Sequence, residues 1–201
     1  MLVKDMYLKN KTVCILIILN FFLSKAYASS NQEIGSISNY ISSLKNFSVS
    51  FLQKESGEFS EGKISIGDER VRVDYTSPTK ILIIISNNKA MYYNYDLDED
   101  EFFDPRDTSA WFFFEIFNNL DFFVNSKISI DENNIIIKKE GYLNNETYKL
   151  TIFFENKPLT IRKIELAIGE RELILSFFNH NYFENFNKNY FKLINPSFFD
   201  Q

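Results

Sequence analysis

Side chains that could do chemistry are scarce in this chain. Its 201 residues include one cysteine, Cys14, and one histidine, His180. These counts argue against cysteine catalysis, thiolate metal sites and disulfide frameworks. No G-x-S-x-G or similar nucleophile motif accompanies His180, which we interpret as a polar loop residue. We therefore predict a protein that is not an enzyme and that uses no metal ion and no cofactor.

Carboxylates are the remaining candidates for chemistry. The spacing Asp96-x-Asp98-x-Asp100 resembles part of an EF-hand calcium loop. Its sixth position is Glu101, where that loop requires glycine, and no predicted helices flank it. We interpret Asp96 to Glu101 as an acidic hairpin turn. Carboxylate pairs for glycosidic chemistry stay open, because a sequence gives no geometry by which to choose a pair.

The charge balance disfavours one class of partner. Lys and Arg total 22 against 27 Asp and Glu, for a formal net charge of −5. Nucleic-acid-binding proteins usually carry a basic excess that replaces phosphate counterions. Nucleic acid is therefore not an expected partner.

The N-terminus has the three parts of an export signal. Lys4, Lys9 and Lys11 precede the apolar run Val13 to Leu23, and a small-x-small pattern follows at Ala26-Tyr27-Ala28. An eleven-residue helix spans about 16 Å, roughly half of a hydrocarbon core, so a membrane anchor is the weaker interpretation. We predict a signal peptide over residues 1–28 and a single exported domain over residues 29–201.

The exported domain begins with a helical pattern and then changes period. Ile34, Ile37, Ile41 and Leu44 share one stripe, which predicts an amphipathic helix within residues 31–46. After it, apolar residues alternate with polar ones, as β-strands require. The expected strands lie at residues 47–53, 63–66, 70–75, 81–85, 90–95, 127–130, 134–139, 148–154, 161–168, 172–178 and 190–193.

One segment, residues 108–123, breaks this alternation. It opens with Thr108 and Ser109 as helix caps and then carries aromatic residues on nearly every side. We predict a helix here, with a break at Asn118-Asn119. Two interpretations stay open, a deeply buried core helix and a lid over a cavity for an apolar ligand. The residues assigned to the lid are Trp111, Phe112, Phe113, Ile116 and Phe117.

Together these elements predict a mainly β fold with helices (α+β). We expect a strongly curved antiparallel sheet of about ten strands, an incomplete β-barrel, capped by helices. Apolar strand faces must be buried, and one short helix cannot cover so many strands. The sheet therefore either closes into a filled barrel or leaves a hydrophobic cavity open to a ligand.

The order of motifs resembles the periplasmic carriers of outer-membrane lipoproteins, the LolA family. Each motif is short, but together they follow the family's order over nearly the whole exported domain. They are Phe47 to Lys54 (F-x-x-x-F-x-Q), Glu61-Gly62, Val71 to Pro78 (L-R-F-x-Y-x-x-P), Ile83 to Lys89 (strand then S-D-G-K), Tyr92 to Asp96 (W-x-Y-[DN]), the segment from Thr108, and Phe191 to Pro196.

The resemblance implies a fold and a function. Family members form an incomplete barrel whose apolar cavity shelters lipoprotein acyl chains. They receive acylated lipoproteins from an inner-membrane ATP-driven transporter and pass them to an outer-membrane acceptor. By resemblance we expect a monomeric periplasmic chaperone in lipoprotein transport. The expected acyl-chain cavity is lined by Phe51, Val71, Val73, Tyr75 and Tyr93.

The chain departs from the family pattern at two places. Gly67-Asp68 stands where members carry an Arg-Pro pair, whose arginine holds the lid closed, so we assign lid hydrogen bonding to Arg70 or Arg72 instead. Ala110 replaces a lid proline. Two other functions stay open, an envelope-stress sensor or regulator that binds a partner protein with the same fold, and a periplasmic enzyme that uses carboxylates.

Overall fold

The computed structural model describes residues 33–67 and 69–198. The predicted signal peptide and Asp68 lie outside these ranges. Met1–Ile37 and Ser38–Gln201 form two separate units. In the first, the described residues 33–37 are helical, and in the second, residues 38–43 are helical and all β-strands follow. No helix in the described ranges is long and apolar enough to cross a membrane.

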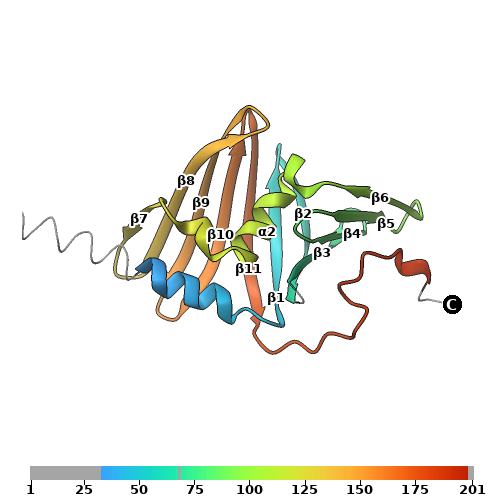
Figure 1. The fold of residues 1–201 in the computed structure, drawn as a ribbon, viewed down its shortest axis with the longest axis horizontal. Coiled ribbons are helices and arrows are strands. Elements are labelled where there is room, and N and C mark those ends of the chain that lie inside the picture. The colour runs from blue at the N-terminus through green and yellow to red at the C-terminus, as the bar shows by residue number, and fades with distance from the viewer. Residues whose placement is uncertain (1–32, 68, 199–201) are drawn as a thin grey trace, which may run out of the picture. The chain divides into compact units, whose positions relative to one another are not determined.

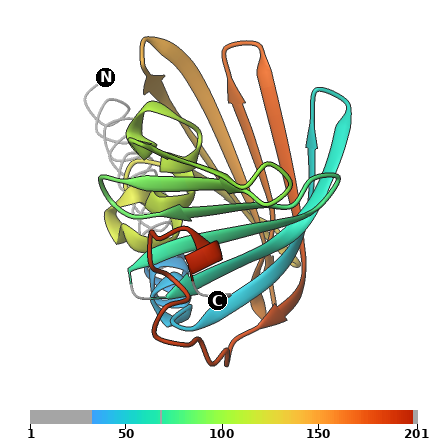
Figure 2. The ribbon, with the colours of Figure 1, turned by 90° about the vertical axis from the view of Figure 1, so that its right-hand side faces the viewer.

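Eleven antiparallel strands form one sheet in the order β6-β5-β4-β3-β2-β1-β11-β10-β9-β8-β7, with β6 and β7 at its two edges (Figure 1). The strands are β1 (Phe47–Glu55), β2 (Glu58–Gly67), β3 (Arg70–Ser77), β4 (Ile81–Ile85), β5 (Ala90–Asn94), β6 (Glu99–Phe103), β7 (Lys127–Ile130), β8 (Asn134–Leu143), β9 (Glu146–Asn156), β10 (Leu159–Ile168) and β11 (Arg171–Asn181). The sheet is strongly curved and unclosed (Figure 2), which confirms the predicted fold class.

The connection between β6 and β7 carries the mid-chain helix. It consists of η1 (Pro105–Asp107), α2 (Ala110–Asn118) and η2 (Leu120–Phe123). The predicted break is confirmed, because Asn119 has extended backbone angles and its side chain accepts a hydrogen bond from the Asp121 backbone at the start of η2. The last residues form η3 (Pro196–Phe198).

Cross-strand register divides the side chains of the sheet between two faces. Val73 lies opposite Ile64 on one side and Ile83 on the other, and α2 contacts this face, which we call the inner face. Arg72 and Asp74 alternate with Val73 and therefore belong to the outer face. Most inner-face side chains are buried, as a strand that packs on one side requires.

Two predicted segments and one predicted loop residue differ in the structure. His180 lies in β11 and not in a loop, and its Nε2 is 2.8 Å from the Ile161 carbonyl oxygen. Glu99 to Glu101 belong to β6, because Glu99 pairs with Asn94 of β5, and the acidic turn shrinks to residues 95–98.

The expected strand at Tyr190 to Leu193 is absent from the described residues: Tyr190 and Phe191 form a turn, and Lys192 and Leu193 are irregular. The Tyr190 N–H donates to the Asn187 carbonyl at 3.1 Å. Apolar residues alternate in this last stretch because some of its side chains pack on the sheet, although the segment itself is irregular.

Candidate functional site

A cavity of about 110 Å³ lies between α2 and the inner face. Strand alternation points Val73 and Tyr75 of β3 and Ile83 of β4 into it, and Phe113 of α2 closes it from the other side. The further apolar lining residues are Ile64, Ile85, Ala110, Leu173 and Leu175. This lining suits an apolar ligand, since it can bury the ligand's apolar surface but offers few hydrogen bonds that would fix its orientation.

A glycine makes room for two of the rings beside the cavity. Gly62 of β2 lies opposite Phe51 of β1 and Tyr75 of β3, and these rings meet edge to face at 5.2 Å. A Cβ at position 62 would come within 2.9 Å of the Phe51 ring and 2.2 Å of the Asp74 carbonyl oxygen. The missing side chain therefore allows the aromatic floor of the site to form.

The structure brings four of the five predicted cavity residues to one face. Val73 and Tyr75 line the cavity, and Phe51 and Val71 are fully buried on the same face. Whether these residues contact an acyl chain stays a prediction.

The fifth residue, Tyr93, lies on the outer face. Tyr93 pairs with Leu82, which pairs with Asp74, whereas Tyr92 pairs with the cavity residue Ile83. The assignment of Tyr93 to the cavity is therefore wrong. Because side chains alternate along a strand, a face assignment that is one residue out of step places every β5 side chain on the wrong face.

The predicted lid residues all lie on α2 and are buried or half-buried. Phe113 faces the cavity, and Phe112 packs edge to face on Tyr148 of β9 at 4.8 Å. Trp111 contacts Phe112 and Phe122 at 5.0 and 6.0 Å. Ile116 is fully buried and Phe117 nearly so.

The helix is attached to the sheet without polar contacts. Within residues 33–67 and 69–198, the hydrogen bonds of α2 all go to residues between Thr108 and Asn119. Its attachment therefore rests on apolar packing, which is non-directional and can be exchanged for packing against another apolar group.

Sequence reasoning missed a second, larger groove at the C-terminal end of α2. Its volume is about 830 Å³, and Phe117 of α2 and Leu120 of η2 form part of its wall. The other lining residues are Ile41, Ser42, Leu44, Lys45, Asn46, Ile66, Gly67, Glu69 and Asn118. Polar side chains make up about half of this lining, so the groove is more polar than the cavity under Phe113.

Arg70 and Arg72 do not hold the lid. Both lie on the outer face and donate to the segment of residues 182–198, which we call the C-terminal segment. Arg70 donates to the Phe191 carbonyl at 3.2 Å, and Arg72 donates to the Tyr190 carbonyl at 2.8 Å. The assignment of lid hydrogen bonding to Arg70 or Arg72 is therefore wrong. Side chains alternate along β3, so these arginines project from the face that is turned away from Val71, Val73 and α2.

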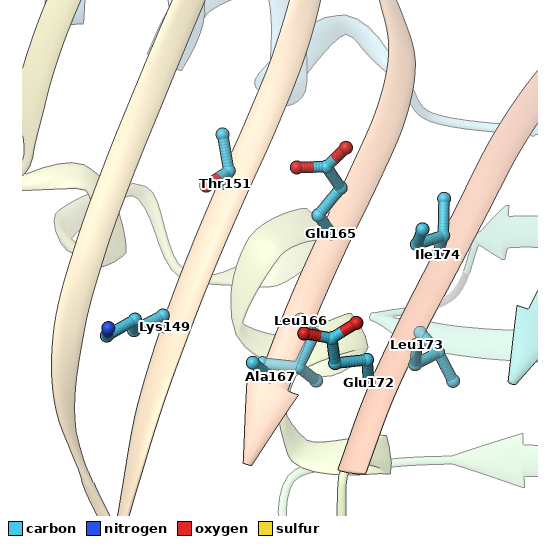
Figure 3. Close-up of a pocket in the computed structure, with 8 residues that line it drawn as sticks. All are labelled: Lys149, Thr151, Glu165, Leu166, Ala167, Glu172, Leu173 and Ile174. Carbon is cyan, nitrogen blue, oxygen red and sulfur yellow. The ribbon is translucent and has the colours of Figure 1, made fainter. Parts of the chain in front are cut away.

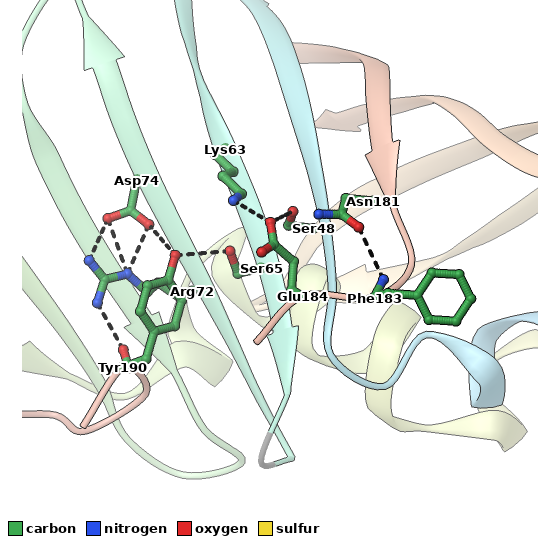
Figure 4. A network of polar contacts seen from close by, with 9 residues as sticks. All are labelled: Ser48, Lys63, Ser65, Arg72, Asp74, Asn181, Phe183, Glu184 and Tyr190. Carbon is green, nitrogen blue, oxygen red and sulfur yellow. Dashed lines mark hydrogen bonds and ion pairs between the residues drawn. The ribbon is translucent and has the colours of Figure 1, made fainter. Parts of the chain in front are cut away.

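The outer face holds the C-terminal segment through a polar network (Figure 4). Arg72 forms a forked ion pair with Asp74 at 2.7–3.1 Å, and its guanidinium stacks 4.1 Å from the Tyr190 ring centroid. Lys63 pairs with Glu184 at 2.6 Å. Hydrogen bonds from Lys63 and from Ser48 hold the pKa of the Glu184 carboxyl below its usual value.

Apolar contacts complete this attachment. The Phe191 ring lies over Gly67, where a Cβ would come within 2.8 Å of it. Leu193 packs on the outer-face cluster of Leu82, Ile84, Met91 and Tyr93. These two anchors explain the apolar alternation near residue 191.

A polar trough lies on the outer side of β9 to β11 (Figure 3). It has a volume of about 350 Å³, and its walls carry the charged residues Lys149, Glu165 and Glu172. Glu165 is already paired with Lys163 at 2.7 Å. In the described ranges no group of three His, Cys, Asp or Glu side chains is placed to hold a metal ion.

Comparisons with known proteins add a fold and one relative. No family model matches the sequence. An uncharacterized protein of Rickettsia prowazekii (strain Madrid E) is 30% identical over 116 residues, which cover 56% of this chain and 54% of that protein. The match thus spans about half the length of the curated relative.

Solved structures resemble the fold at low sequence identity. An uncharacterized conserved protein from Thermus thermophilus has a TM-score of 0.51 at 10% identity, over 78% of this chain and 90% of that one. A DUF1329 family protein from Desulfovibrio piger has a TM-score of 0.46 at 9% identity, over 80% and 96%. LprF from Mycobacterium bovis has a TM-score of 0.37 at 8% identity, over 76% and 93%. The likeness to the Thermus protein shows that the curved sheet is a recurring fold and shows no function.

Proposed function

We propose that this protein is a periplasmic chaperone that shelters lipoprotein acyl chains beneath α2 and carries them from the inner to the outer membrane. The observation that supports this most directly is the attachment of α2, which closes an apolar cavity and makes no hydrogen bond to the sheet in the described ranges. An acyl chain can replace the apolar contacts between α2 and the sheet, because both are contacts between hydrocarbon groups.

The size of the cavity requires that α2 moves. A volume of about 110 Å³ is smaller than the roughly 150 Å³ cavity that accommodates benzene in an engineered protein. A long acyl chain therefore fits only if α2 withdraws from Val73 and Ile83. Each sheltered methylene contributes about 0.8 kcal/mol, so a dozen contribute on the order of 10 kcal/mol toward this movement.

The remaining parts of the proposal follow from the resemblance to the LolA family. A cleaved signal peptide over residues 1–28 would export the chain. An ATP-driven transporter of the inner membrane would supply acylated lipoproteins, and an acceptor at the outer membrane would receive them. Loose, apolar attachment of the lid suits such a transfer, because the cargo must also be released.

The binding step is tested with two matched lid variants. Phe113 and Phe114 are neighbours on α2 and both are half-buried, but only Phe113 lines the cavity under the helix. We expect Phe113→Glu to weaken binding of an apolar fluorescent probe at least tenfold, because the carboxylate enters an apolar site. Phe114→Glu should change the affinity less than twofold.

Displacement of the probe by a synthetic triacylated lipopeptide identifies the ligand class. Trp111 is the chain's single tryptophan, so its emission reports on α2 during the same titration. Equal probe affinity in both folded variants, or no displacement by the lipopeptide, would contradict the proposal.

Transport is tested in cells. Mass spectrometry of the protein purified from the periplasm should detect bound lipoproteins of several sequences. Recovery of a single defined protein without acyl chains would favour a regulator instead.

A further inference from the structure

One end of the cavity under α2 is polar. Tyr75 donates a hydrogen bond from its hydroxyl to Gln53 Oε1 at 2.8 Å, and Gln53 Nε2 donates to Glu55 Oε2 at 3.0 Å. All three residues line the cavity, and the Gln53 side chain is only 7% exposed. A buried amide in an apolar site is costly to place, so its presence calls for a reason beyond packing.

This chain of side chains keeps unused hydrogen-bonding capacity. A glutamine amide offers two donors and two acceptor lone pairs, of which Gln53 uses one donor toward Glu55 and one lone pair toward Tyr75. The Tyr75 oxygen can still accept. Ser109 lines the same end, and its hydroxyl makes no capping bond to α2.

The open end of the cavity carries an excess of negative charge. Glu55 is exposed, and in the described ranges its carboxylate contacts an amide and no cation. Arg171 lies nearby on the continuation of the cavity, where its charge is offset by Glu146 at 3.5 Å. Glu55 and Tyr75 line the same cavity, and the negative charge of Glu55 adds to the effect of burial in raising the pKa of Tyr75.

The start of α2 does not supply an anion site in compensation. The N–H of Ala110 donates to Thr108 Oγ1, that of Trp111 donates to the Thr108 carbonyl, and that of Phe112 donates to the Ser109 carbonyl. A carboxylate entering here would meet occupied donors and a like charge.

We propose that Gln53, Tyr75 and Ser109 bind the uncharged ester or amide linkage at the head of an acyl chain, and that Glu55 excludes free fatty-acid anions. This inference rests on the proposed function, because it assumes that the cavity takes acyl chains. The polar groups would then distinguish an acyl ester or amide from a free fatty acid, since the apolar lining contacts the hydrocarbon chains of both in the same way. A periplasmic carrier that bound free fatty acids equally well would be blocked by them.

Two ligands with the same twelve-carbon chain test the selection. Monolauroylglycerol carries an ester and no charge, and laurate carries a carboxylate. Each displaces an apolar fluorescent probe from the mature protein below its micelle concentration, at pH 8. The measured quantity is the ratio of the two dissociation constants in each variant relative to the wild type.

For Glu55→Gln, we expect laurate to bind about three- to tenfold more tightly and monolauroylglycerol to be unchanged. Lys54→Gln is the matched control, because Lys54 is the exposed neighbour whose side chain alternates to the outer face. It should leave both constants unchanged.

For Gln53→Met, which keeps the length of the side chain, we expect about three- to tenfold weaker binding of monolauroylglycerol with probe affinity retained. Tyr75→Phe should also weaken the binding of monolauroylglycerol, and it keeps the ring that packs on Phe51.

The outcomes separate this inference from the proposed function. If the wild-type protein binds no probe, the acyl cavity itself is wrong and the selection falls with it. If the probe and monolauroylglycerol bind but the ratio stays the same in Glu55→Gln and Gln53→Met, the selection is overturned and the carrier function stands.

Discussion

α2 covers part of the inner face, and the C-terminal segment crosses the outer face, but different forces hold them. In the described ranges α2 is attached by apolar packing around Phe112, Phe113 and Ile116. The C-terminal segment is attached by hydrogen bonds from Arg70 and Arg72 to its backbone carbonyls and by the Lys63–Glu184 pair, and Asp74 orients Arg72.

The contrast predicts which covering an acyl ligand would displace. A hydrocarbon chain offers the inner face the same dispersion contacts as Phe113, so exchange costs little. It offers no partner to the Arg72 guanidinium or to the Tyr190 carbonyl, and leaving these groups unpaired costs free energy. We therefore expect α2 to be the movable covering and the C-terminal segment to be the fixed one.

The largest expected effect is on the fixed covering. Arg72→Leu leaves Asp74 without its guanidinium partner and the Tyr190 carbonyl without its donor, at a site where the arginine is 16% exposed. We expect the free energy of unfolding to fall by about 3 kcal/mol and residues 182–198 to become sensitive to protease. Urea denaturation and limited proteolysis measure both.

The control is the exposed pair Arg162–Glu155. Arg162→Leu should lower the free energy of unfolding by less than about 1 kcal/mol. Adding Asp74→Leu to Arg72→Leu should restore part of the loss, because no carboxylate is then left unpaired. Equal losses from Arg72→Leu and Arg162→Leu would show that the network does not hold the segment.

Alkaline pH should act on the inner face. Burial, with a smaller contribution from the charge of Glu55, raises the pKa of Tyr75 to about 12, from 10.0. A raised pKa stabilises the fold below pH 10, and this stabilisation is lost as the pH rises toward 12. Between pH 9 and pH 11 the wild type should lose about 1 kcal/mol more than Tyr75→Phe in the free energy of unfolding. Identical losses would place Tyr75 in a wetter environment.

Acid should act on the outer face. Hydrogen bonds from Lys63 and Ser48 lower the pKa of Glu184 from 4.5, so the stabilisation is present above pH 4.5 and is lost as the pH falls through the lowered pKa. The pair is partly exposed, and the effect should stay below about 1 kcal/mol. The protection factors of residues 182–198, which correct for the slower intrinsic amide exchange in acid, should fall on acidification in the wild type and be already low in Lys63→Met.

Salt should produce the smallest difference. Raising NaCl from about 0.05 to about 0.5 M screens exposed ion pairs and leaves apolar packing intact. Amide exchange in residues 182–198 should then rise about twofold, whereas exchange in α2 should not rise. A faster exchange in α2 than in the C-terminal segment would reverse the comparison.

Much of the fold followed from local patterns. Period-two alternation at Val71, Val73 and Tyr75 needs one buried face, and the break at Asn118-Asn119 is a property of the residues themselves. The sequence also indicated the aromatic helix and its position between two groups of strands.

The errors arose where both faces of a strand are apolar. Ile81–Ile85 is apolar throughout, so the pattern does not show which side faces α2, and Tyr93 was assigned to the wrong face. The outer cluster is covered by Leu193, which lies at least a hundred residues away along the chain. The partners of Arg70 and Arg72 depend on the same distant segment, which alternation had predicted to be a strand.

The movement of α2 relative to β3 is the central claim, and a distance measurement tests it directly. Residues 29–201 contain no cysteine, so spin labels can be placed at Asn118→Cys on α2 and Thr76→Cys on β3. A reference pair joins Thr76→Cys to Lys188→Cys in the C-terminal segment. With a bound triacylated lipopeptide, the distance from residue 118 to residue 76 should lengthen and the reference distance should stay the same. If the lipopeptide binds and neither distance changes, or the reference pair alone moves, α2 is not the lid.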